Sequence, residues 1–179
     1  RSLAAVLHAW MHALAAARSA GTAADAVLMR AIVRYVQAFP LALHHPKEDQ
    51  HLFKRLRERT SEVNAELDEL ERQHQRDHQL VAELATMVET LAACQDAASA
   101  QAATRALERA VPAYASFLWE HMGREEGVIL PAAQRHLNAA DWAQIDAAFR
   151  QNRDPHFGAD SDKEYRQLFS RIVNAAPGW

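Results

Sequence analysis

Apolar residues recur every three or four positions along most of the chain, which is the spacing of one face of an α-helix. One such stretch opens the chain, and a second runs from about residue 23 to 59 with Pro40 and Pro46 inside it. Each proline is expected to bend or break that helix, because it removes a backbone donor and crowds the preceding turn. Two longer stripes follow over residues 67–91 and 107–128. The pattern predicts an all-α fold with four long amphipathic helices.

Short breaks separate the four helices. Gly21 gives a helix stop signal, and Thr22 is a candidate N-cap for the second helix. Ser61 is a candidate N-cap for the third helix, which the polar stretch 94–101 closes. Helices joined by short connections pack most simply as antiparallel neighbours. We therefore expect an up-down-up-down four-helix bundle over about residues 1–137.

The remainder of the chain, about residues 138–179, is typical of a C-terminal helical appendage. The pattern predicts one short helix over 138–150 and another over 161–173. We expect both to pack outside or across the bundle, so that residues 1–179 form a single domain.

Composition narrows the classes of function. The chain has 179 residues, 49% of them hydrophobic and 24% charged, which suits one domain with a sizeable core. A net charge of −3 gives no electrostatic reason to expect nucleic acid or an anionic membrane as a partner. We see no run of about 18 apolar residues that would predict a membrane span. The single Cys94 fits a reducing compartment, so a cytoplasmic protein is expected.

Ten histidines are the unusual feature of the composition. His44 and Glu48 are four residues apart, and so are His121 and Glu125, which places each pair on one helix face about 6 Å apart. His74 takes a core position of the third helix. Burying such polar groups costs several kcal/mol unless they are paired or bind a metal. The pattern therefore predicts a metal site in the bundle core.

Antiparallel geometry brings these five residues to one level, because residues equally far from a turn lie side by side in a helical hairpin. Positions 44–48 and His74 are equally far from the predicted turn at Thr60. His74 and positions 121–125 are equally far from the turn inside 94–101. The second, third and fourth helices are therefore expected to supply ligands to one site.

The first helix is the exception. In the first helix, the position as far from the turn at Gly21 as positions 44–48 are would lie upstream of Arg1. His8 lies one residue's rotation, about 100°, away from the apolar stripe of its helix. We therefore expect His8 and His12 to be surface or boundary histidines, and a first-helix ligand to lie upstream of Arg1.

The stretches "HHPKEDQHLF" and "HMGREEGVILP", with His74 between them, resemble the hemerythrin-like, or HHE cation-binding, domain. The resemblance implies a non-haem di-iron centre inside the bundle. It implies that His44 binds one iron with a first-helix histidine, and that His74 and His121 bind the other. Glu48 and Glu125 would bridge the two ions. Two iron ions are expected, or one if the first-helix ligand is absent; spacing alone does not select iron over zinc or manganese.

Several residues near these motifs stay open as ligands or as groups that hydrogen-bond a ligand: His45, Asp49, His51 and His78. His78 lies one turn past His74, where oxygen-carrying members of the family use a histidine pair. His136 and His156 lie outside the cluster, and Tyr114 is expected in the core. We expect a dry pocket around the metals, lined by Trp10, Val81 and Leu118.

These features predict a di-iron protein that binds or senses a small oxidant such as O₂, NO or peroxide. One alternative is a di-iron enzyme that reduces peroxide or NO or repairs iron–sulfur clusters, so whether the protein is an enzyme stays open. A second alternative is a helical interaction module with a vestigial or zinc site. A ferric–oxo absorption band separates the metal hypotheses from the module, and turnover separates the enzyme from the binding protein.

Overall fold

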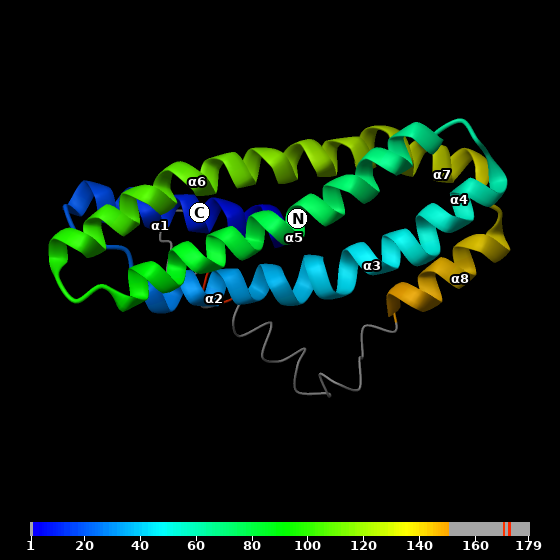
Figure 1. Cartoon of the computed structure of the whole chain (residues 1–179). Helices are drawn as coiled ribbons and strands as arrows, with labels where there is room; N and C mark the ends of the chain where they lie inside the picture. The colour runs from blue at the N-terminus through cyan, green and yellow to red at the C-terminus, as the bar shows by residue number, and fades with distance from the viewer. Residues whose placement is uncertain (1, 151–169, 171, 173–179) are drawn as a thin grey trace.

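The computed structural model describes residues 2–150, 170 and 172. Four helical rods lie side by side, and the first is much shorter than the other three (Figure 1). The first rod is α1 (Ser2–Ala20), the third is α5 (Asn64–Ala93), and the fourth begins with α6 (Ala97–Arg124). The second and fourth rods are built from shorter segments in series: α2 (Ala26–Val36), η1 (Gln37–His44), α3 (His45–Lys47), η2 (Glu48–Phe53) and α4 (Lys54–Arg59), then η3 (Glu125–Ile129) and α7 (Leu130–His136) after α6.

The rods pack as a four-helix bundle. α1 contacts α2 and α6, and α5 contacts the same two helices, so the four rods close into a ring. Consecutive rods run in opposite directions (Figure 1), and the described part of the chain contains no strand. The all-α, up-down-up-down prediction is confirmed.

The helix breaks lie where the sequence predicted them, but the caps differ. Gly21 has a φ of 64°, the left-handed conformation that ends helices, and its N–H donates to the Arg18 carbonyl. Asp25, not Thr22, is the N-cap of α2, because its carboxylate accepts from the N–H groups of two residues in the first turn. Ser61 is not the N-cap of α5 either, since that helix begins at Asn64.

The two prolines of the second rod change its pitch without breaking it. Pro40 lies in η1 and Pro46 in α3. Because proline has no N–H to donate, the regular bonding pattern fails there, and the His45 N–H bonds the carbonyl of Pro40, five residues back. The turns of the π-helical segments η1 and η2 are wider than those of an α-helix, and they change which side chains of this rod face the bundle axis.

Two apolar clusters fill the bundle, one at each end. One is built on α1, α2 and the ends of α5 and α6 that pack against them, and it includes Leu7, Trp10, Val81 and Leu118. The other lies between α4, α7, α8 and the start of α5, and it includes Phe53, Leu70 and Ile129. Along each of the second, third and fourth rods the two clusters are separated by a stretch that carries the buried histidines.

The appendage begins with α8 (Ala139–Arg150), as predicted for residues 138–150. Asn138 and Asp141 cap it reciprocally, each side chain accepting from the other's backbone N–H at 3.0 Å. Asp141 also accepts two hydrogen bonds from Arg59, at 2.8 and 2.9 Å, which fixes α8 against α4. The second predicted helix, over 161–173, lies outside the described residues apart from positions 170 and 172.

The second rod, Ala26–Arg59, is long and apolar enough to cross a membrane by length and composition alone. Buried helices of bundles pass the same test, and here the inner face of the rod packs in the two apolar clusters.

Candidate metal centre

A polar cluster lies between the two apolar clusters. His45, Glu48, His74 and His121 are buried, and each offers one ligand atom within 4.8 Å of those of the others. They come from the second, third and fourth rods. Ligand atoms at about 2.1 Å from an ion lie about 3–4 Å from one another, so a small inward movement of these atoms would let them surround a single metal ion.

The five residues predicted as ligands come together at this level. His44 Nε2 is 3.1 Å from Glu48 Oε1, and His121 Nε2 is 3.0 Å from Glu125 Oε1. Two ligands at right angles on one ion, each about 2.1 Å from it, are separated by about 3 Å. His44 is the outermost of the five, with 42% of its side chain exposed.

Glu48 lies between two imidazoles. Its Oε1 faces His44, while its Oε2 faces His74 Nε2 at 3.6 Å. The side chain is buried and begins η2, directly after the short segment that carries Pro46. A carboxylate whose two oxygens face different histidines can bind two ions at once.

His45 is more central than the sequence indicated. Its ring is buried and stacks on His74, with 4.1 Å between ring centroids. With regular α-helical spacing, the sequence leaves His45 open as a ligand or as a group that hydrogen-bonds a ligand. The wide turns of η1 and η2 on either side rotate it onto the bundle axis. A histidine pair flanking Pro46 was the signal available in the sequence.

Two of the three buried imidazoles have a hydrogen-bond partner at Nδ1. His74 Nδ1 lies 2.8 Å from an Asp49 oxygen, and His121 Nδ1 lies 3.0 Å from Gln73 Oε1. The Nδ1 of the third ring, His45, lies 3.8 Å from an Asp77 oxygen, which is too far for a hydrogen bond. Partners of this kind orient the ring and leave the other nitrogen for a metal.

Burial and neighbouring charges set the protonation of the cluster. Burial, together with the neighbouring imidazoles, lowers the pKa of His45 to about 2, so this ring is neutral at physiological pH. Burial raises the pKa of Asp77 to about 6. Burial opposes protonation of His121, but the nearby carboxylate of Glu125 outweighs this effect and raises the pKa of His121. Burial also opposes protonation of His44, but Glu48 outweighs this effect and raises the pKa of His44.

Buried polar atoms without a hydrogen-bond partner gather in this cluster. Among the described residues they include Glu48 Oε2, His74 Nε2, His121 Nε2 and Glu125 Oε1. Unsatisfied buried groups are costly, so native proteins pair nearly all of them. A metal ion would satisfy these atoms together, so the donor set fits a metal centre of imidazole and carboxylate ligands.

The other candidates lie away from the cluster. His8 is exposed and its ring lies tilted against that of Trp119, and His12, His51 and His78 are exposed. His136 pairs with Glu62 at 2.8 Å, and His156 lies outside the described residues. Tyr114 is buried in the core, as predicted.

A cavity of about 480 Å³ opens on the cluster from the side of α8. Its polar wall includes His44, His45, Glu48, His121 and Glu125. Its apolar wall includes Phe39, Leu118, Ile129, Trp142, Ile145 and Phe149, the last three from α8. Of the residues expected to line a pocket, Leu118 does so, whereas Trp10 and Val81 belong to the apolar cluster at one end.

Comparison with known families agrees with this geometry. The family model for the hemerythrin HHE cation-binding domain matches residues 1–133. The chain therefore belongs to the hemerythrin HHE family, and the resemblance seen in the sequence is confirmed. Searches of curated proteins and of solved structures gave no match. The family and the histidine–glutamate cluster together indicate a metal-binding protein with a small-molecule ligand.

Proposed function

We propose that this protein holds two non-haem iron ions in the cluster and binds or senses a small oxidant such as O₂, NO or peroxide. The observation that carries the proposal is the position of Glu48, whose two oxygens face His44 on one side and His74 on the other. A carboxylate placed in this way suits two ions, whereas a single structural zinc takes four ligands around one point. Imidazole and carboxylate ligands suit iron.

The ligand roles follow from the neighbours of each group. His74 and His121 would hold one ion, joined by His45, because these three rings and Glu48 form the tight buried set. His44 would hold the other ion. Glu48 and Glu125 would bridge the two. The His44 ion has fewer imidazoles among the described residues, so it would supply the open position to which an oxidant binds.

The cavity supports this choice of ligand. It reaches His44, and its remaining walls are largely apolar. Neutral apolar molecules such as O₂ and NO enter an apolar space at low cost, whereas ions lose hydration there. The cavity is also far larger than a diatomic molecule, so it has room for more than one reactant, as the alternative of a di-iron enzyme requires.

Metal analysis and an absorption spectrum of protein loaded with Fe(II) and exposed to air test the proposal. We expect two irons per chain and an oxo-to-iron charge-transfer band that changes when NO is added. One tightly held zinc with no iron uptake would contradict the proposal. Consumption of peroxide or NO over many turnovers would favour the enzyme.

A further inference from the structure

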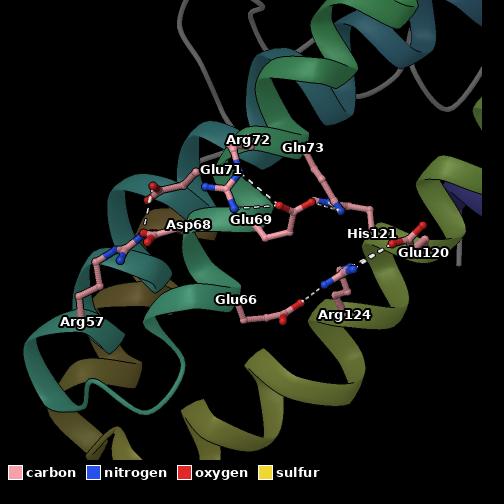
Figure 2. A network of polar contacts seen from close by, with 10 residues as sticks. All are labelled: Arg57, Glu66, Asp68, Glu69, Glu71, Arg72, Gln73, Glu120, His121 and Arg124. Atoms are coloured by element: carbon pink, nitrogen blue, oxygen red, sulfur yellow. Dashed lines mark hydrogen bonds and ion pairs between the residues drawn. The ribbon is translucent and has the colours of Figure 1, made fainter.

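A chain of hydrogen bonds runs from the surface of α5 to His121 (Figure 2). Arg72 donates to Glu69 Oε2 at 2.9 Å through Nη2 and at 3.2 Å through Nε. The Gln73 side-chain amide lies between Glu69 and His121, 3.0 Å from an oxygen of the first and 3.0 Å from Nδ1 of the second. Gln73 and His121 are both buried, while Arg72 is exposed.

The charges at the surface end fix the direction of every bond in this chain. Arg72 can only donate, and an ionised carboxylate can only accept. The hydrogen bonds from Arg72 and then Gln73 lower the pKa of Glu69, so it is ionised at neutral pH. Gln73 must therefore turn its NH₂ group to Glu69, which leaves its oxygen facing His121.

The orientation of the amide then decides the tautomer of the imidazole. Because an amide oxygen can only accept, His121 must carry a proton on Nδ1. The lone pair of the neutral ring is then on Nε2, the nitrogen that faces Glu125 Oε1 at 3.0 Å. A metal ligand needs a lone pair at this nitrogen.

We propose that Gln73 is a positioning residue that holds His121 in its metal-binding tautomer, with Glu69 and Arg72 anchoring the amide at the surface. This inference rests on the proposed function only in taking His121 as a ligand.

The same arrangement makes the two imidazoles of one ion unequal. His74 donates to a carboxylate, Asp49, whereas His121 donates to a neutral amide. A carboxylate draws the imidazole proton more strongly and makes the ring a stronger donor to the metal. Gln73 therefore holds the geometry of His121 without raising its donor strength to that of His74.

Three variants of this chain and one control test the assignment. Gln73→Leu replaces the amide by a smaller apolar side chain and so removes the acceptor, and Gln73→Glu keeps an acceptor for Nδ1. Glu69→Gln frees the amide to turn over, because the new side chain can donate as well as accept. The control is Glu66→Gln on the same helix: Glu66 pairs with Arg124 at 2.8 Å and takes no part in the chain (Figure 2).

Two readouts apply to each folded protein. Nitrogen NMR of the His121 ring reports the tautomer, in metal-free protein at about pH 9, where imidazoles are neutral, and in zinc-loaded protein. Competition with a chelator gives the affinity for Zn²⁺. We expect a proton on Nδ1 in the wild type and a loss of Zn²⁺ affinity of about 10–100-fold in Gln73→Leu. Gln73→Glu should bind Zn²⁺ at least as tightly as the wild type, because a carboxylate then accepts from Nδ1. Glu69→Gln should show a mixture of tautomers, and Glu66→Gln should match the wild type.

A proton on Nε2 of His121 in the metal-free wild type would overturn the inference. A folded Gln73→Leu protein that binds Zn²⁺ within about twofold of the wild type would also overturn it. If the wild type binds no metal, the proposed function fails, while the tautomer measured in metal-free protein still decides the role of Gln73. If Gln73→Leu does not fold, the tautomer of His121 measured in Glu69→Gln decides the role of Gln73 instead.

Discussion

Glu48 is the side chain on which the two-ion arrangement depends most. It is buried, it begins η2, and its two oxygens face His44 and His74. Burial and the charge of Glu125 raise its pKa, so a buried carboxylate here is stabilised in its ionised form only when cations compensate it. This makes Glu48 the most direct test of metal bridging.

Glu48→Gln should lower the metal content from two ions per chain towards one, because an amide is a poor bridging ligand. The affinity for the remaining ion should fall by about tenfold or more, since Glu48 contributes to it as well. Elemental analysis after dialysis against a weak chelator measures both effects. Glu126→Gln is the control, because Glu126 is exposed on the neighbouring stretch of η3. An unchanged metal content in Glu48→Gln would remove the bridging role.

At the residue level, the sequence could give the paired motifs but not their supporting groups. The spacing of His44 to Glu48, and of His121 to Glu125, predicted two pairs that the structure shows at 3.1 and 3.0 Å. The Nδ1 partners of the histidines come from positions 25 and 48 residues away, which local periodicity cannot reveal. The ligand role of each residue stays a prediction.

The helical segments around Pro46 show how a local change of helix type can change the direction in which the following side chains point. α3 spans only three residues, His45–Lys47, between two π-helical segments. One extra residue in a helical turn rotates every following side chain by about 100° around the helix axis. The sequence predicted a bend or a break at the prolines, because it cannot tell a break from a widened turn.

Pro46→Ala restores a backbone N–H and should favour a regular α-helical turn. The His44–Glu48 pair and the position of His45 beside it would then be disturbed, and we expect metal affinity to fall by roughly tenfold while the helix content is kept. Chelator competition and circular dichroism measure the two effects. Pro112→Ala in α6 is the matched control, since that proline is exposed and lies away from the cluster. Equal metal affinities for the two variants would show that the wide turns do not depend on Pro46.

The attachment of α8 gives a prediction with a defined pH dependence. The hydrogen bonds from Arg59 are the main cause of a lowered pKa at Asp141. A carboxyl group with a lowered folded-state pKa stabilises the fold fully above its ordinary value, about 3.9, and loses that contribution as pH falls through the folded value. Docking of α8 should therefore weaken below about pH 4.

Asp141→Asn should show the same weakening at neutral pH. Amide hydrogen exchange in residues 139–150 should become faster in this variant, while exchange in the four rods changes little. Asp146→Asn is the control, since Asp146 is exposed and its ion pair is with Arg150 on the same helix, at 3.8 Å. Slow exchange in α8 of Asp141→Asn at neutral pH would show that apolar contacts alone fix this helix.

The whole bundle has an apolar cluster on each side of the polar layer, and this division follows from the sequence. Apolar stripes on four helices predicted the bundle, and equal distances from the turns predicted that the three ligand-bearing helices meet at one level. The cavity wall from α8 was not predictable, because a short amphipathic helix gives no signal for the surface on which it packs.

Because the two apolar clusters do not depend on the polar layer, the metal-free protein should remain folded. Circular dichroism should show the same helix content with and without metal, and in His121→Ala, which should lose metal. Metal should still raise the melting temperature, because it binds the folded form: at about 100 times Kd the added stability is about 2.7 kcal/mol. For a chain of this length each kcal/mol corresponds to roughly 2–4 °C. A metal-free protein without helical signal would show instead that the polar layer needs its ions to fold.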